Sequence, residues 1–448
     1  MKRKIIAAAA ITAILALSSC GTVGRPDPTT ITRKDQQRYN SDTESFDDSS
    51  DTDESAFDQD SSADESSSTK EKSEEEIEKE KKEKEKQEKI EKAVNSTMKD
   101  MTVEEKVGQL FIVRADALES DFSADTVNDD DAAGVTFVDD IMKQSIDKYH
   151  VGGVVVYEKN VESKDQLKSL IKDLQKESDI TLFVGVDEEG GRTSTLASNE
   201  DLKLKTFESM AAVGKTEDTD QAKKVGTTIG TYLSDLGFNL NFAPVADVYS
   251  NAENQIIGDR SFSSKPEIVS KMVTAEIKGL HSKNIMTAVK HYPGFGDVSG
   301  GINGVMASTS KNWVELMECD MIPFTEAIKQ TDMIMAGHIT APKATKDGMP
   351  ASMSKELISD KLRGELGYNG VVITDSMADA SVTASFNSGE SAVRAISAGV
   401  DIVLTPYDLD SAYNAVLDAV NSGTISEERL DESIQRILTL KAEYGLIG

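Results

Sequence analysis

The segment 290–303 (KHYPGFGDVSGGIN) and Asp375, the last residue of VVITD, hold residue types suited to sugar chemistry. Lys290 and His291 can donate hydrogen bonds to sugar hydroxyls. Asp375 ends an apolar run, and a carboxylate placed there can attack an anomeric carbon or activate water. The end of the segment, 301–303 (GIN), offers no side chain that acts as an acid near neutral pH. The residues therefore predict a grip on sugar and a nucleophile, with no evident proton donor.

Polar residues end most of the apolar runs further along the chain. They are Asp187, Asp247, Lys290, His291, His338 and Asp375. Carboxylates, imidazoles and an ammonium on one rim suit carbohydrate chemistry, because sugars need dense hydrogen bonding. The same imidazoles and carboxylates could bind zinc, but the chain has no HxH or HExxH spacing. We therefore expect no metal and no cofactor; for any single residue, a helix-capping role is the alternative.

Eight apolar, β-branched runs are the elements that must position these side chains. The runs are 108–113, 151–157, 181–187, 239–247, 285–294, 333–339, 370–375 and 401–406. They show little alternation, as expected of parallel strands covered on both faces. Amphipathic helical patterns lie between them, at 137–148, 220–237, 355–367 (closed by Gly367) and 426–446 (capped by Ser426). This order predicts an α/β fold, a (β/α)8 barrel in which function collects at the carboxyl ends of the strands. An open doubly wound sheet is the alternative, but DEEGGR (187–192) is no dinucleotide fingerprint.

The first twenty residues have the layout of a secretory signal. A basic start (2–4) precedes an apolar stretch (5–17) that is too short to span a bilayer comfortably, and LSSC ends at Cys20. This order predicts cleavage before Cys20 and a lipid on its thiol, which would tether the protein to the outer face of a bacterial membrane. An uncleaved anchor is the alternative. Cys319 is the only other cysteine, so we expect it to be a small core residue without a disulfide.

Composition divides the chain further. Residues 1–19 form the signal peptide, and residues 20–69, rich in Ser and Asp, bury too little apolar surface to fold. Residues 70–97 place Glu and Lys three and four apart, which predicts an exposed helical spacer. Residues 98–448 hold the barrel. The net charge of −30 at pH 7 argues against a nucleic-acid partner, and the oligomeric state stays open.

Several motifs, in order along the chain, resemble glycoside hydrolase family 3, in its single-domain β-N-acetylglucosaminidase branch. They are MTVEEKVGQLF (101–111), VGGVVVY (151–157), VDEEGGR (186–192), LGFNLNFAPVADV (236–248), RSFS (260–263), KHYPGFGD (290–297) and ITDSM (373–377). The likeness runs from about residue 98 to the C-terminal ISEERLDESIQRIL. It implies a barrel that removes β-linked N-acetylglucosamine, or a related hexosamine, from cell-wall or other glycans.

The resemblance also implies roles for single residues. Asp375 matches the nucleophile that forms a covalent glycosyl-enzyme, which makes the mechanism retaining. Asp187 matches the aspartate that grips sugar hydroxyls. Arg260, Lys290 and His291 match the residues that hold the hydroxyls of the N-acetylglucosamine ring.

One departure from the branch concerns the general acid. The branch loop reads KHFPGHG, followed four residues later by Asp-Ser/Thr-His, whose histidine is the acid/base; here 301–303 stand at those positions and Phe295 replaces the histidine of PGHG. A missing general acid typically costs about 10²–10⁴-fold in rate. Asp297 is a possible stand-in acid, and a structural turn residue is the alternative. The sequence therefore leaves three readings: a hydrolase with an atypical acid, a degenerate barrel that binds surface glycans, and a hydrolase of another sugar class. The natural glycan and the exo or endo preference stay open.

Overall fold

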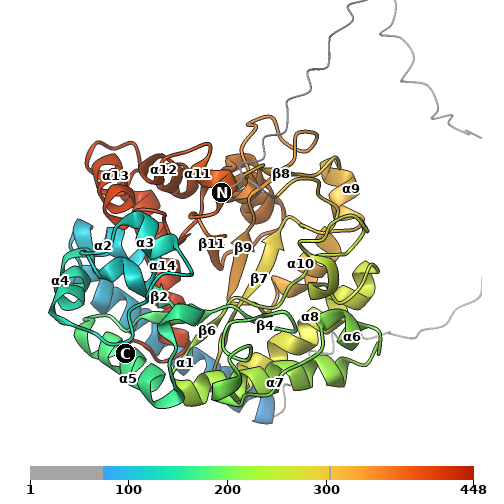
Figure 1. Ribbon diagram of the computed structural model, residues 1–448, viewed down its shortest axis with the longest axis horizontal. Helices are drawn as coiled ribbons and strands as arrows, with labels where there is room; N and C mark the ends of the chain where they lie inside the picture. The colour runs from blue at the N-terminus through green and yellow to red at the C-terminus, as the bar shows by residue number, and fades with distance from the viewer. Residues whose placement is uncertain (1–73, 302–303) are drawn as a thin grey trace, which may run out of the picture. The chain divides into compact units, whose positions relative to one another are not determined.

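The computed structural model describes residues 74–301 and 304–448. Eight parallel strands form one sheet in the order β11-β9-β7-β6-β3-β2-β1-β12. Their bounds are β1 Phe111–Arg114, β2 Gly153–Val155, β3 Phe183–Val186, β6 Leu240–Asn241, β7 Met286–Tyr292, β9 Met333–Ala336, β11 Val371–Thr374 and β12 Val403–Leu404. The two ends of the sheet meet, because Ile373 bridges Ile402 and the N–H groups of Asp401 and Ile402 donate to the carbonyl of Val372 at 2.8 and 3.1 Å. The predicted barrel is confirmed, and each predicted run overlaps one of its strands (Figure 1).

Helices surround the sheet and bury the outer faces of its strands. The longer ones are α2 Val103–Gln109, α4 Asp140–Tyr149, α5 Lys164–Glu177, α7 Thr219–Leu236, α8 Pro266–His281, α10 Met321–Ala327, α12 Ser388–Ala398, α13 Leu409–Asn421, α14 Glu427–Glu443 and the π-helix η6 Glu356–Glu365. Because both faces of the strands are covered, every residue of β1, β3, β9 and β11 is buried. This explains why the runs read as continuously apolar rather than alternating.

Short elements lie in the loops between strands and helices. The short helices are α3 Ala124–Asn128, α6 Met210–Gly214, α9 Trp313–Met317 and α11 Ala380–Thr383, with 3-10 turns η1 Ala115–Leu118, η2 Glu158–Asn160, η3 Glu200–Leu202, η4 Gly258–Arg260 and η5 Ala351–Met353. Two small sheets pair β4 Glu188–Gly190 with β5 Thr193–Ser194, and β8 Ala307–Ser308 with β10 Ile339–Thr340. Two of these elements, β4 and η4, lie in loops that follow barrel strands and contain the site residues Glu189 and Arg260.

Capping residues explain where the predicted helices begin and end. Ser426 accepts the N–H of Arg429 at 3.2 Å, as its position before α14 predicts. The helix predicted at 137–148 begins only at Asp140, because Asp139 accepts the N–H groups of Ile141 and Met142. The predicted helix 355–367 is a π-helix, and Gly367 follows it with φ +71°.

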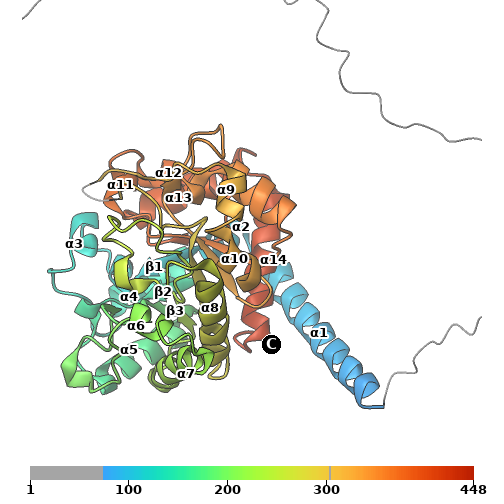
Figure 2. The same cartoon turned by 90° about the vertical axis from the view of Figure 1, so that its right-hand side faces the viewer.

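The charged segment forms one long helix, α1 (Glu74–Asp100), but one face of its C-terminal part is buried. Residues 78–89 are exposed, whereas Ile90 and Val94 are only 6% and 3% exposed and α1 packs against α14 (Figure 2). The spacing of four residues puts both side chains on one face of the helix, which the barrel then covers.

Two other expectations concern the cysteines and the membrane. Cys319 is half-buried and its thiol is free. In the part of the chain that the structure describes, no helix combines the length and apolar character needed to cross a bilayer. The signal, Cys20 and the linker 20–69 lie outside the described residues.

Candidate active site

A network of four charged side chains lies at the carboxyl ends of β3 and β7. The ammonium of Lys290 lies 2.6 Å from Oδ1 of Asp187 and 2.7 Å from Oε1 of Glu189. Arg260, at the end of η4, donates two hydrogen bonds to Glu189, from Nε to Oε2 at 2.8 Å and from Nη2 to Oε1 at 2.7 Å. Three of the predicted sugar-binding residues are thus brought together, and Glu189 links two of them.

Burial alone would favour neutral forms in this network, but the opposite charges prevail. Burial opposes ionisation of Glu189, yet Lys290 and Arg260 hold the pKa of Glu189 well below its usual range. Burial lowers the pKa of Lys290 as well, and Asp187 and Glu189 more than restore it, so the pKa of Lys290 is raised. Glu189 and Lys290 are therefore ionised together near neutral pH.

The members of the network differ in how far they reach solvent. The side chain of Asp187 is 32% exposed and that of Arg260 is 13% exposed, whereas those of Lys290 and Glu189 are 3% and 1% exposed. Asp187 and Arg260 are thus the groups that a ligand at the barrel mouth meets first. Lys290 and Glu189 are buried, and they pair with Asp187 and Arg260, respectively.

His291 is held on both sides of its ring. Nδ1 lies 2.7 Å from Oδ2 of the fully buried Asp247, and Nε2 lies 3.4 Å from Nη2 of Arg260. The other oxygen of Asp247 accepts the N–H groups of His291 and Phe295, at 3.3 and 2.6 Å. Because a carboxylate only accepts, Nδ1 carries a proton, and Nε2 faces the guanidinium. Asp247 therefore fixes both the ring and the loop that follows β7.

Asp375 lies at the end of β11, where its N–H donates to the carbonyl of Ala336 at 2.8 Å. Its Oδ1 accepts the N–H of Ser376 at 2.8 Å, and within the described residues its Oδ2 accepts no hydrogen bond. Burial raises the pKa of Asp375, but His291, His338, the Ser376 N–H and Lys290 together bring it below its usual value. The carboxyl is thus ionised, with one oxygen open to a ligand.

His338, at the end of β9, is fixed beside Asp375. Its Nε2 lies 2.8 Å from the carbonyl of Ser376, and its Nδ1 lies 2.8 Å from the hydroxyl of Ser352. Since a carbonyl only accepts, Nε2 carries a proton. His338 therefore holds the carbonyl of Ser376, the residue that follows Asp375. Both of its ring nitrogens have a hydrogen-bond partner.

Asp297 does not lie open toward the barrel mouth. Its Oδ2 accepts the hydroxyl of Thr309 at 2.9 Å and lies 3.7 Å from the ammonium of Lys311, and its side chain is 12% exposed. Its Oδ1 is buried and has no partner among the described residues. An acid role for Asp297 therefore requires the side chain to turn.

The loop after Asp297 is described up to Gly301, which has φ +79° and donates to the carbonyl of Val305 at 2.9 Å. Ile302 and Asn303 lie outside the described residues. Phe295, at the position of the branch histidine, packs edge-on against His291 with ring centroids 5.7 Å apart. An aromatic ring can pack there but cannot donate a proton.

Two buried residues central to the site were given no role from the sequence. Glu189 stands second in a run of acids, and a run alone does not tell which carboxylate turns inward. Asp247 is a rim residue by position, but its three hydrogen bonds depend on the path of a distant loop. The order of strand ends signalled Asp247, because functional strand ends of a barrel meet at one face, but it gave no signal for Glu189.

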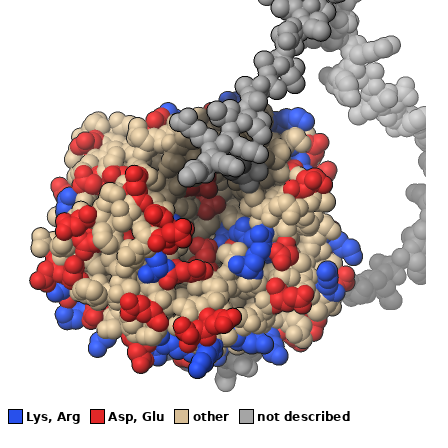
Figure 3. Space-filling view, in the orientation of Figure 1, with Lys and Arg blue, Asp and Glu red and all other residues tan. Residues whose placement is uncertain are grey.

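The mouth of the barrel forms a hollow with acidic and basic side chains beside it (Figure 3). Among the described residues, no cluster of three or more His, Cys, Asp or Glu side chains is arranged to hold a metal ion. Carboxylates and cations held in fixed positions thus lie together at the carboxyl ends of the strands of a (β/α)8 barrel, the face at which barrel enzymes place their active sites.

The comparisons with known proteins define the class more narrowly. Residues 102–440 match the glycosyl hydrolase family 3 N terminal domain, and the chain belongs to this family. Beta-hexosaminidase A of Pseudoalteromonas piscicida is 32% identical over 337 residues, covering 69% of this chain and 56% of the relative. The resemblance read from the sequence motifs is confirmed.

Two solved structures are similar to this chain over more than three quarters of its length. A family 3 β-N-acetylglucosaminidase from Paenibacillus sp. aligns with TM-score 0.69 and 32% identity, covering 77% of this chain and 63% of that one. A structure of the β-glucoside phosphorylase BglX aligns with TM-score 0.68 and 25% identity, covering 80% of this chain and 61% of that one. The chain thus spans less than two thirds of each of these three proteins.

Proposed function

We propose that the protein is a retaining glycosidase that removes β-linked N-acetylglucosamine, or a related hexosamine, from cell-wall or other glycans. Asp375 is the nucleophile in this proposal, and one observation carries it. The carboxyl is ionised, lies beside His291, His338 and Lys290, and has one oxygen that accepts no hydrogen bond from any described residue. Membership in family 3 and the hexosaminidase names of its relatives support the sugar class.

The charged network supplies the sugar grip in this proposal. Asp187 and Arg260 reach the mouth and bind ring hydroxyls, while Lys290 and Glu189 keep them in place. His291 contributes through Nε2, the nitrogen that Asp247 leaves free. Charge-assisted hydrogen bonds of this kind are about twice as strong as neutral ones, and a prearranged set costs little reorganisation.

The general acid is atypical or impaired in this proposal. The branch motif is replaced at 301–303, and Asp297 faces Thr309 and Lys311. Formation of the glycosyl-enzyme then depends strongly on how easily the leaving group departs without a proton. Activated glycosides are cleaved much faster than natural ones.

The test compares an aryl β-N-acetylglucosaminide that has an acidic phenol with a natural disaccharide. We expect turnover of the aryl glycoside, a covalent adduct on Asp375 by mass spectrometry after a fluorinated aminosugar inactivator, and acceleration by azide. Asp375→Asn should lower turnover by about 10²–10⁴-fold or more. Asp360→Asn, an exposed aspartate on η6, serves as the matched control and should change nothing. Adduct formation on another residue would rule out the assignment.

Two alternative functions are each favoured by one observation. A barrel that binds glycans without cleaving them is favoured by the sequence GIN at 301–303, and in that case neither substrate turns over. Another sugar class is favoured by the likeness to a β-glucoside phosphorylase, and an aryl glucoside would then be preferred over the aminosugar.

We also propose that the protein acts outside the cytoplasm, held to the membrane by a lipid on Cys20. The basic start, the short apolar stretch and LSSC support this location. Metabolic labelling with a clickable palmitate analogue tests it, because Cys20→Ser should abolish the label.

A further inference from the structure

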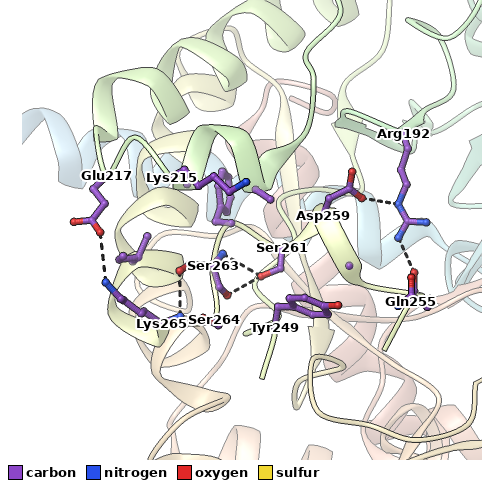
Figure 4. A pocket seen from close by; sticks show the side chains of 15 residues that line it. Arg192, Lys215, Glu217, Tyr249, Gln255, Asp259, Ser261, Ser263, Ser264 and Lys265 are labelled. Carbon is purple, nitrogen blue, oxygen red and sulfur yellow. Dashed lines mark hydrogen bonds and ion pairs between the residues drawn. The ribbon is translucent and has the colours of Figure 1, made fainter. Parts of the chain in front are cut away.

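A groove of about 740 Å³ lies beside the sugar-binding network and is formed by α6, α8 and the η4 segment (Figure 4). Neither Asp375 nor Lys290 lines it, so it is not the hollow that holds the proposed nucleophile. Its size is within the range of ligand sites in proteins.

The groove and the sugar-binding network share two walls. Asp259 lines the groove and directly precedes Arg260, which binds Glu189. On the other wall, Arg192 follows β4, the strand that contains Glu189, and donates to the carbonyls of Gln255, Ile256 and Ile257 at 3.0, 2.7 and 3.0 Å.

A hydrogen bond ties the same wall to His291. Ser261, which lines the groove, donates to the carbonyl of Asp247 at 2.6 Å, and the carboxylate of Asp247 holds His291. A ligand in the groove thus lies next to the η4 segment, whose Arg260 we propose to hold a sugar.

The charges in the groove suit a neutral ligand. Arg192 pairs with Asp259 at 2.9 Å and Lys265 pairs with Glu217 at 3.6 Å, which leaves Lys215 as the only lining charge without an ion-pair partner among the described residues. A polyanion would find one uncompensated cation in a protein of net charge −30. Hydroxyl groups, in contrast, can pair with both members of an existing ion pair.

Two lining residues add an aromatic face and a hydroxyl. Tyr249 lines the groove, and its ring is fixed because its OH donates to the carbonyl of Ala252 at 2.9 Å (Figure 4). Ser264 also lines the groove and is exposed, and its hydroxyl makes no hydrogen bond to any described residue. A fixed ring beside hydroxyl and amide groups matches the alternating apolar and polar faces of a sugar.

We infer that this groove binds the further units of an oligosaccharide whose first unit occupies the site at Asp375. The inference rests on the proposed function for the identity of the sugar. It assigns the protein to chains of several β-linked N-acetylglucosamine units rather than to single glycosides.

Calorimetric titration with N-acetylglucosamine and with its β-1,4-linked oligomers of two to five units tests this. The Asp375→Asn form of the full chain prevents turnover. We expect affinity to rise about tenfold or more between the monosaccharide and the tetramer, a gain of about 1.4 kcal/mol. Ser264→Trp, which fills the groove, should abolish the rise and leave monosaccharide affinity and aryl-glycoside turnover within twofold. Lys265→Trp provides a second filling variant, and Ser422→Trp, exposed at the end of α13, is the matched control.

The outcomes separate this inference from the proposed function. Affinity that does not depend on oligomer length, or a length dependence that both filling variants retain, overturns the groove assignment even if the aryl glycoside is cleaved. Length-dependent binding that the filling variants remove supports it even if no substrate turns over, and in that case only the hydrolytic function fails.

Discussion

Glu189→Gln is the substitution that tests the charged network most directly. The change keeps the shape of the side chain but removes the charge that pairs with Lys290 at 2.7 Å and with Arg260 through two hydrogen bonds. Removing one partner of a buried ion pair costs about 3–5 kcal/mol, because the remaining charge stays buried without compensation. Asp187 still pairs with Lys290, so we expect a loss near the lower end, about 3 kcal/mol.

The pH dependence of this loss follows from the lowered pKa of Glu189. A group whose pKa is lower in the folded state contributes stability above its unfolded pKa and loses it as pH falls. The wild-type advantage over Glu189→Gln should therefore be full at pH 7 and shrink below about pH 4.5, the ordinary value for glutamate. Urea unfolding followed by circular dichroism at pH 7, 5 and 4 measures it.

Glu390→Gln is the matched control, because Glu390 pairs with Arg394 through two hydrogen bonds on the surface of α12. Its side chain is 41% exposed, and such a helix pair is worth only about 0.3–0.5 kcal/mol. Glu189→Gln should also lower kcat/KM on the aryl glycoside about 10²-fold by misplacing Arg260, whereas Glu390→Gln should not. Equal losses of stability in the two variants would refute the idea that a buried, mutually neutralised network supports the site.

Three further predictions concern other buried groups. Burial lowers the pKa of Lys441 to about 7 although its ammonium lies 2.8 Å from Oε1 of Gln109. Wild-type stability should therefore rise between pH 7 and about 10.5, where the unfolded lysine keeps a proton that the folded one has lost, and Lys441→Met should remove that rise in urea unfolding. Lys311→Met leaves the carboxylates of Asp297 and Asp320 buried without their shared cation, so unfolding free energy should fall by about 3–5 kcal/mol and partly recover in Lys311→Met/Asp320→Asn. Gly296→Ala places a Cβ 1.7 Å from the carbonyl oxygen of Val248 and should abolish turnover. Gly348→Ala meets open space but puts a Cβ on backbone with φ +68°, so it should cost about 1–2 kcal/mol and keep activity.

The barrel could be predicted because its signal is local and repeated. Each of the eight runs is apolar and short, and each is followed by a helical pattern, so the errors are confined to the ends of elements. The helix at 137–148 starts later because Asp139 caps it, and the burial of Ile90 and Val94 depends on α14, which lies more than three hundred residues further along the chain. Contacts at that separation leave no trace in local periodicity.

The site could be predicted only in part, because strand ends indicate which residues share a face but not which of them touch. Asp187, Arg260, Lys290 and His291 come together as expected, yet two acids given no role from sequence, Glu189 and Asp247, hold the last three in place. Asp297, in contrast, was predicted to take part in the chemistry but does not lie open toward the barrel mouth. Its place in the loop made it a possible acid, and its bond to Thr309 depends on a residue twelve positions away that the loop motif does not include.

The three acids of the run 187–189 contact different partners, although the sequence motif groups them together. Asp187 faces the mouth and pairs with Lys290. Glu188 turns the other way, accepting the N–H groups of Leu196 and Ala197 and the hydroxyl of Tyr232; burial raises the pKa of Glu188 to about 6 despite these bonds. Glu189 points to Lys290 and Arg260. Because neighbouring side chains of an extended segment point to opposite faces, one acid anchors the loop while its two neighbours pair with the cations near Asp375. A neutral sugar can enter such a site without leaving any charge unpaired, whereas an anionic ligand would have to displace Asp187.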